Sequence, residues 1–166
     1  METIFKRRSI RRYTSEPVSD EQVTAILKAA MAAPSAGNQQ PWHFVVLRDP
    51  DIKNGVPDVH PYSRMVVEAP VAIAVCADMS LVSHAGMWEQ DCAAATQNLL
   101  LAVTDLGLGA VWLGVHPRED RVAGLKKLLR LPDTVIPFAL VPVGHPAESK
   151  GPADYYREDR IHQDQW

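Results

Sequence analysis

Apolar residues recur at helical spacing in SDEQVTAILKAAMAA, residues 19–33. The stripe comprises Val23, Ile26, Leu27, Ala30 and Met31. Ser19 and Gln22 have the spacing of a capping box, in which each side chain bonds the backbone of the other residue. Pro34 does not continue a helix, so the pattern predicts a helix that begins near residue 19 and ends before residue 34.

Four short apolar runs predict strands. They are HFVVL (43–47), VAIAVCA (71–77), AVWLGV (110–115) and PFALVPVG (137–144). The segment KNGVPDVHPYS (53–63) is predicted to be a loop because it contains glycine and prolines. A second amphipathic helix is predicted at 118–131. Helices that alternate with strands favour an α/β or α+β layered fold, in one domain of 166 residues.

The longest helix candidate is WEQDCAAATQNLLLAVTDLG, residues 88–107, with Gly107 at its C-terminal cap. It is apolar nearly all round, which predicts burial on all sides. Such burial is difficult in so short a chain, so the pattern favours a partner subunit; a central core helix in a monomer is the alternative. Glu89 and Asp91 are interpreted as acids that the helix N-terminus favours.

Composition excludes several classes of function. The net charge of −3 argues against a nucleic-acid-binding surface. Cys76 and Cys92 lie in apolar runs and form no CxxC pair, so we expect reduced, structural thiols. The start of the chain has no apolar signal segment, and no apolar run reaches the roughly 20 residues that span a membrane. We therefore expect a cytoplasmic protein without a membrane span.

No motif for a nucleophile, a metal or a glycine-rich phosphate loop is present. The six histidines are scattered, without HExxH spacing, and there is no GxSxG, GxGxxG or GxxxxGK[ST]. We therefore predict no catalytic side chain and no metal site. Any bound phosphate has to be held by side chains.

An arginine cluster, RRSIRRY (7–13), is the candidate for that phosphate. Guanidinium groups bind phosphate through paired, charge-assisted hydrogen bonds, and Ser9 can add a hydroxyl. In a helical turn, Arg7 would share a face with Arg11, and Arg8 with Arg12. A solvated basic turn is the alternative interpretation.

The connection PSAGNQQPW (34–42) joins the first predicted helix to the first predicted strand. It is rich in uncharged hydrogen-bonding groups and has no charged residue. It is either a well-capped loop or a cradle for a flat polar ligand.

These segments together resemble the FMN-dependent nitroreductase family. The resemblance covers almost the whole chain and rests on RRSIRRY, APSAGNQQPWHF, EAPVAIAVCAD, QDCAAATQNLLLAVTDLGLGAVWLGVHP and LPDTVIPFALVPVGHPAE, in that order. It implies a single domain over residues 1–166 with an α+β fold, a three-layer sandwich around a mixed, mainly antiparallel sheet. It also implies an intertwined homodimer that holds FMN at the subunit interface, with the tail 146–166 wrapping around the partner.

The resemblance also implies roles for individual residues. Arg7, Arg8 and Ser9 would lie near the FMN phosphate and ribityl chain, and Arg11 near N1 and O2 of the ring. The residues expected to line the ring from the other subunit are Pro34, Ser35, Ala36 and Asn38. The backbone of Leu113 and Gly114 would lie near N5. Where similar proteins often carry basic residues in the tail, this chain has Ala153 and Tyr155, so Lys150 or Arg157 would take that place.

The activity that the resemblance implies is transfer of hydride from NAD(P)H through the flavin to a nitroaromatic, a quinone or a similar conjugated acceptor, by a ping-pong mechanism. Only MSLVSHAG (79–86) separates the second predicted strand from the long helix, so we expect an open pocket. The alternatives are a narrow-substrate flavin dehydrogenase or dehalogenase-like enzyme on the same fold, and a non-catalytic protein that stores FMN.

Overall fold

The fold is built on one five-stranded sheet. The computed structural model describes residues 1–166. The strands are β1 (Trp42–Leu47), β2 (Val71–Asp78), β3 (Gly109–Ala110), β4 (Leu113–Gly114) and β5 (Val135–Gly144), in the order β1-β2-β5-β3 with β4 also on β5. All of these pairs are antiparallel, and one isolated bridge, between Ser9 and Ala110, is parallel. The predicted mixed, mainly antiparallel sheet is confirmed.

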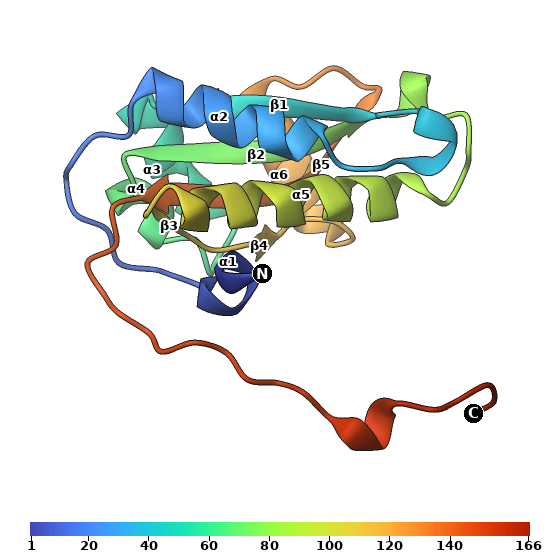
Figure 1. Ribbon diagram of the computed structural model, residues 1–166. Helices are drawn as coiled ribbons and strands as arrows, with labels where there is room; N and C mark the ends of the chain where they lie inside the picture. Colours follow the sequence, from blue (N-terminus) through green and yellow to red (C-terminus); the bar gives the residue numbers. More distant parts are fainter.

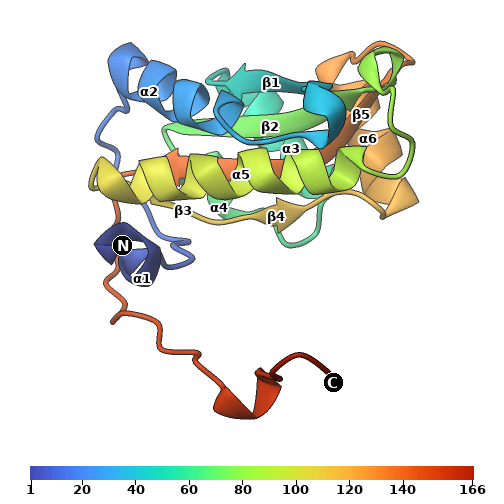
Figure 2. The ribbon, with the colours of Figure 1, turned by 45° about the vertical axis from the view of Figure 1, so that its right-hand side comes forward.

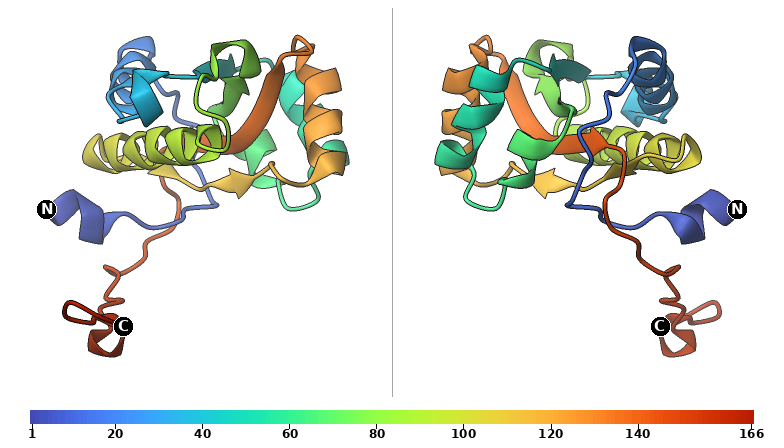
Figure 3. Two further views of the ribbon diagram at one scale, coloured as in Figure 1. Left: turned by 90° about the vertical axis from the view of Figure 1, so that its right-hand side faces the viewer. Right: turned by 90° about the vertical axis from the view of Figure 1, so that its left-hand side faces the viewer.

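Helices cover both faces of the sheet (Figures 1 and 3). On one face lie α2 (Asp20–Met31) and α5 (Trp88–Asp105); on the other lie α3 (Pro50–Val59), α4 (Met65–Glu68) and α6 (Glu119–Leu129). Alternate residues of β2 enter different cores: Ile73 and Val75 pack with α2 and α5, whereas Ala74 and Cys76 pack with α3 and α6. The predicted three-layer sandwich is confirmed.

The predicted capping box of α2 is present. The Ser19 hydroxyl accepts from the Gln22 N–H at 3.2 Å, and the Gln22 side-chain Oε1 accepts from the Ser19 N–H at 2.9 Å. The helix ends at Met31, before Pro34, and buries Val23, Ile26 and Ala30 of the predicted stripe.

The predicted loop at 53–63 is wrong, because most of it belongs to α3. Asp49 caps this helix by accepting from the Asp51 N–H at 2.8 Å, and Pro50 occupies its first turn. Gly55 lies where a side-chain carbon would stand 3.0 Å from Leu128 of α6. Gly55 therefore allows α3 to pack closely against α6, whereas the sequence alone suggested that a glycine here would interrupt a helix.

The predicted strand at 110–115 is interrupted at Val111 and Trp112. Both of its parts, β3 and β4, keep one register on β5, in which Val111 would lie opposite Pro142. Pro142 has no N–H for the ladder, and its carbonyl accepts instead from the Tyr13 hydroxyl at 3.2 Å. The ladder therefore loses its bonds there and resumes at Leu113.

Helix α5 forms as predicted, and Gly107 follows it with a φ of +72°. Within one chain the helix is not buried on all sides, and burial of its remaining face by a partner stays a prediction. One stripe is buried, formed by Trp88, Asp91, Cys92, Ala95, Thr96, Leu99, Leu100 and Val103. Gln90 and Gln97 are exposed, and Ala94 and Ala102 are half-buried. The helix thus keeps one outward face lined by small and amide side chains.

The two ends of the chain lie together before the tail departs. A short helix, α1 (Glu2–Lys6), leads into the arginine cluster, and the Ala147 N–H donates to the Arg12 carbonyl at 2.9 Å. The Ala153 N–H donates to the Phe5 carbonyl at 3.2 Å. Beyond it the tail extends away from the body, as Figures 1 and 2 show, and every residue from 154 to 166 is exposed. None of the helices is both long and apolar enough for a membrane crossing.

Candidate functional site

The arginine cluster is extended and lies along the sheet edge formed by β3. The helical turn considered for it is wrong, since residues 7–18 contain no helix. The Ile10 N–H donates to the Ala110 carbonyl at 2.9 Å. Tyr13 anchors the segment to β5, because its buried hydroxyl contacts both the Ile10 carbonyl at 2.6 Å and the Pro142 carbonyl at 3.2 Å. Burial raises the pKa of Tyr13, so the phenol stays protonated and can donate.

Basic groups gather around this segment. The Lys150 ammonium donates to the Ser9 carbonyl at 2.6 Å, and Arg8 donates to the Gly151 carbonyl. The acid beside them is Glu148, which accepts from the Arg11 N–H at 2.6 Å and pairs with Lys150 at 3.4 Å. The Arg11 N–H bond, and then the charge of Lys150, hold the pKa of Glu148 below its usual value. The segment therefore keeps a surplus of positive charge suited to a phosphate.

Gly114, four residues after the Ala110 that bridges to Ser9, presents an uncommitted amide. Val115 donates to the Phe138 carbonyl at 3.1 Å, so Val115 and Leu113 occupy the hydrogen-bonded positions opposite β5. The N–H and C=O of Gly114, which lies between them, point away from β5. No strand lies on that side, and no side chain bonds the N–H. A side-chain carbon added at Gly114 would meet no atom within 4 Å, so the surface there is open to a flat group.

The loop of residues 34–42 is held by a buried acid. Asp91, 4% exposed, accepts from the Ala36 N–H at 2.9 Å and from the Gln39 side-chain amide at 2.6 Å. The side-chain Oε1 of Gln39 in turn accepts from the N–H groups of Ser83 and His84, both at 2.9 Å. Asp91 does lie in the first turn of α5, as interpreted, but its contacts identify it as the anchor of this loop.

The backbone of this loop is strained, which the network offsets. Gly37, Asn38 and Gln40 have φ values of +55°, +57° and +45°. A side chain at Gly37 would overlap the imidazole of His84. The Gln40 N–H donates to the Ser35 hydroxyl at 3.0 Å. The capped-loop interpretation is thus correct for Ser35 and Gln39, while Pro34 and Asn38 remain exposed.

One chain does not bring all the predicted residues together. Pro34, Ser35 and Ala36 border a hollow over the N-terminal half of α5, with Gln90 and Ala94. Figure 2 shows that loop beside the first turn of α5, with α1 beneath the other end of the helix. Arg157 lies in the exposed tail. Within one chain, the arginine cluster and β4 therefore lie apart from the loop.

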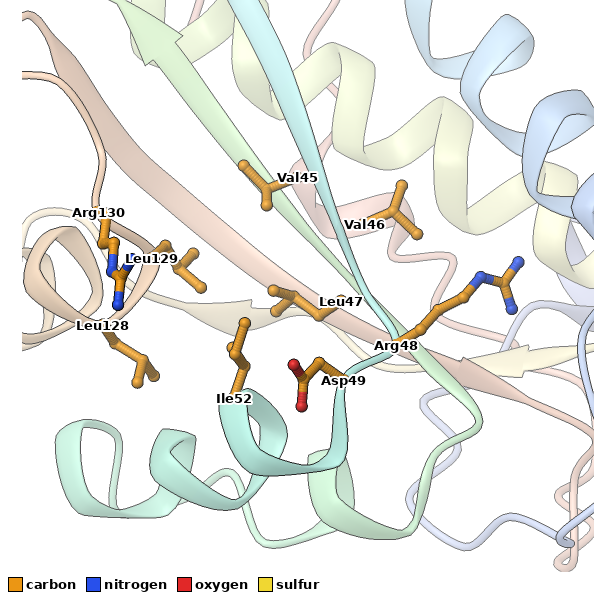
Figure 4. A pocket seen from close by; sticks show the side chains of 9 residues that line it. All are labelled: Val45, Val46, Leu47, Arg48, Asp49, Ile52, Leu128, Leu129 and Arg130. Atoms are coloured by element: carbon orange, nitrogen blue, oxygen red, sulfur yellow. The ribbon is translucent and has the colours of Figure 1, made fainter.

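A second hollow lies at the opposite edge of the sheet (Figure 4). The unpaired side of β1 borders it through Val45, Val46 and Leu47, with Ile52 of α3 and Leu128 and Leu129 of α6. Arg48, Asp49 and Arg130 stand at its rim. Four strands separate this groove from the arginine cluster.

The two thiols are buried in the core. Burial raises the pKa of Cys76 and of Cys92 to about 12, so neither supplies a thiolate near neutral pH. No cluster of His, Cys, Asp or Glu side chains has an arrangement that could hold a metal ion. Sequence reasoning missed His60 and Arg121, which both contact the Gly114 carbonyl from other elements. They are 61 residues apart, and no local motif joins them.

Comparison with known proteins places these features in context. A family model described as "Nitroreductase family" matches residues 4–65 and 58–145. A protein of Methanothermobacter thermautotrophicus with the provisional name NADH dehydrogenase/NAD(P)H nitroreductase is 51% identical over 166 residues, covering 100% of this chain and 87% of its own. An iodotyrosine deiodinase of Haliscomenobacter hydrossis is 29% identical, over 93% of this chain and 82% of its own.

Solved structures agree with the fold. An FMN-dependent nitroreductase of Clostridium difficile R20291 superposes with a TM-score of 0.91 at 25% identity, over 99% of this chain and 98% of its own. A protein of Clostridium acetobutylicum, provisionally called an NADH oxidase, has a TM-score of 0.96 at 42% identity, over 99% of both chains.

Proposed function

The chain belongs to the nitroreductase family, and on that premise we propose that it is an FMN-dependent, NAD(P)H-dependent oxidoreductase whose two active sites form between two subunits. The observation that carries the proposal is the open surface at Gly114. Its free N–H and its lack of a side chain suit the close approach of a flat ring, and the adjacent arginine cluster suits the phosphate of the same ligand.

Different residues of the chain would bind different parts of FMN. Arg7, Arg8 and Ser9 would bind the phosphate and ribityl chain, with Lys150 beside Ser9 as the additional cation. Arg11 would face the pyrimidine end of the ring. Bound FMN supplies the electron transfer itself, and the protein supplies binding, orientation and electrostatics. No side chain is assigned as a proton donor, in agreement with the high pKa of both thiols.

The second half of each site would come from the partner. Pro34, Ser35, Ala36 and Asn38 would line the ring from the other subunit, held in place by Asp91. The outward face of α5 supports this arrangement, since small side chains such as Ala94 and Ala102 allow another helix to approach closely. An obligate interface typically buries about 2,000 Å² or more.

The tail 146–166 provides a second element of the proposed dimer. It carries exposed apolar residues, namely Tyr155, Tyr156, Ile161 and Trp166. The groove beside β1 offers apolar side chains and a row of unpaired backbone groups to an added strand (Figure 4). Residues 152–166 reach about 50 Å when extended. We therefore assign the partner's tail to this groove, and Arg157 to the partner's site.

The experiment is a spectrum of the purified protein followed by anaerobic titration with NADH and with NADPH. We expect a yellow protein that bleaches with at least one donor, and FMN bound more tightly than riboflavin because the phosphate meets arginine. A quinone should restore the colour. Bound flavin that no reduced nicotinamide bleaches would indicate storage instead of catalysis. Equal affinity for FMN and riboflavin would contradict the phosphate assignment.

The electron acceptor is the compound that reoxidises the reduced flavin. We propose a nitroaromatic, a quinone or a similar conjugated compound, reduced after the donor has left the same open face. Dehalogenation is the second candidate, because one relative, 29% identical over 93% of this chain, is named an iodotyrosine deiodinase. Parallel turnover assays with a quinone, a nitroaromatic and an iodophenol separate the two: iodide release at a rate above that of quinone reduction would favour the second.

A further inference from the structure

We propose that His60 and Arg121 form a clamp on the Gly114 carbonyl, and that this clamp aims the Gly114 N–H at the bound ring. The inference rests on the proposed function, because it concerns the same site. It assigns a positioning role to two residues, neither of which is assigned a direct contact with FMN.

Two donors from different elements converge on one carbonyl oxygen. His60, at the C-terminal cap of α3, places Nε2 at 3.1 Å from the Gly114 oxygen. Arg121, in the first turns of α6, donates to the same oxygen from Nη1 at 2.7 Å. The two nitrogens are 3.4 Å apart. One peptide is therefore fixed by two helices that pack on the same face of the sheet.

The missing side chain of Gly114 opens the surface to the ring, but it also leaves the backbone there free to rotate. Without a Cβ, glycine rotates freely about φ and ψ, and β4 has only two residues to restrain it. The ladder holds the neighbours of Gly114 but neither its own N–H nor its own carbonyl. Fixing the carbonyl leaves the N–H pointing into the open surface. A donor that is already oriented loses less entropy when it bonds a ligand.

Each clamp residue has a further contact of its own. His60 is 1% exposed, and its own carbonyl accepts from the Ser63 hydroxyl at 2.7 Å. The Arg121 guanidinium lies over the ring of Tyr62, 5.6 Å from its centroid. Because Nδ1 of His60 has no partner, the proton of the neutral ring belongs on Nε2, where it meets the carbonyl. Burial and the adjacent Arg121 charge lower the pKa of His60, which favours this neutral form.

The test follows the Gly114 amide directly. The chain has nine glycines, so ¹⁵N-glycine labelling gives a spectrum simple enough to assign. Amide exchange is measured with and without FMN in the wild type and in His60→Phe and Arg121→Met, which remove a donor while keeping much of the side chain's bulk. Arg118→Met is the matched control, because Arg118 is an exposed arginine of the same region whose side chain bonds nothing.

In the wild type we expect FMN to protect the Gly114 amide from exchange. Each clamp variant should lose this protection by about tenfold, the factor that corresponds to one hydrogen bond of about 1.4 kcal/mol, while Arg118→Met should not. Arg121→Lys, which keeps a donor, should lose less protection than Arg121→Met. If Arg121→Met fails to fold, Arg121→Lys is compared with the wild type, and a partial loss is expected. FMN reduction should slow in the clamp variants with little change in the nicotinamide KM.

Three outcomes overturn the clamp: unchanged protection in both variants, an equal loss in Arg118→Met, or a loss in Arg121→Lys as large as that in Arg121→Met. A wild type whose Gly114 amide gains no protection from FMN overturns the ring assignment itself. The two failures are therefore distinguishable.

Discussion

Removal of the Asp91 carboxylate tests how the loop of residues 34–42 is held. Asp91 accepts two hydrogen bonds, from the Ala36 N–H at 2.9 Å and the Gln39 amide at 2.6 Å. Hydrogen bonds to charged groups contribute about 1.5–3 kcal/mol each. Asp91→Ala forfeits both, although it also removes the cost of burying a carboxylate. We expect a net loss of about 3 kcal/mol in the free energy of unfolding.

The measurement is thermal and urea unfolding at a fixed protomer concentration, because stability and assembly are linked. For a chain of this length about 3 kcal/mol corresponds to a Tm lower by roughly 6–12 °C. Asp91→Asn should lie between, since an amide keeps one acceptor but turns donors toward the Gln39 amide. FMN affinity should fall with stability, because the loop is proposed to line the ring in the partner.

Glu89 supplies the control. It lies in the same first turn of α5, so both acids share any interaction with the helix N-terminus. Its Oε2 is buried without a partner, so Glu89→Gln should leave the Tm nearly unchanged or raise it. Equal losses for Asp91→Ala and Glu89→Ala would show that only the helix terminus matters and would refute the anchoring role.

Three further predictions concern charge and titration. Arg11→Ala should lower the flavin midpoint potential by on the order of 40 mV, or about 2 kcal/mol, because a cation near the ring favours the reduced flavin; Arg12→Ala should change it less, and a dye-equilibrated titration decides. Cys76→Ala and Cys92→Ala should retain flavin reduction by NAD(P)H, and a folded, FMN-loaded variant that is inactive would contradict this. Because the pKa of His60 is lowered in the folded chain, the unfolded chain takes up a proton first as pH falls, and the free energy of unfolding should decrease as pH drops through about 6.5. His60→Phe should reduce this dependence of the free energy of unfolding on pH between about pH 7.5 and 5.5, as measured by urea titrations.

The elements that sequence could predict are those whose signals are local. The α2 capping box, the two long inner strands and the extent of α5 all follow from short-range patterns. Helix α3 was not predicted because a glycine such as Gly55 by itself indicates a turn. In the fold, Gly55 allows close contact with Leu128 of α6, a helix far away in the sequence. The gap at Val111 depends on Pro142 and Tyr13, which meet only in the folded sheet.

The residues of the candidate site also fall into those with a local sequence signal and those defined only by long-range contacts. Sequence identified the arginine cluster and the loop 34–42 by composition and order, and their roles toward FMN stay predictions. The loop's anchor, Asp91, was visible but was interpreted through its helix alone. His60 and Arg121 carried no signal, because their common partner is a backbone carbonyl far from both in the chain.

The left-handed backbone at Gly37 has a consequence for mutational tolerance. Gly107, at φ +72° with open space around it, should accept asparagine in a saturation library. Gly37, at φ +55°, has the His84 imidazole where a side chain would begin, so the library should return glycine there unless residue 84 also changes. The His84 N–H donates to the Gln39 side chain, and the His84 ring contacts the Ser83 hydroxyl. Positions 37 and 84 should therefore covary among functional variants, with a larger residue at 37 paired with a smaller one at 84.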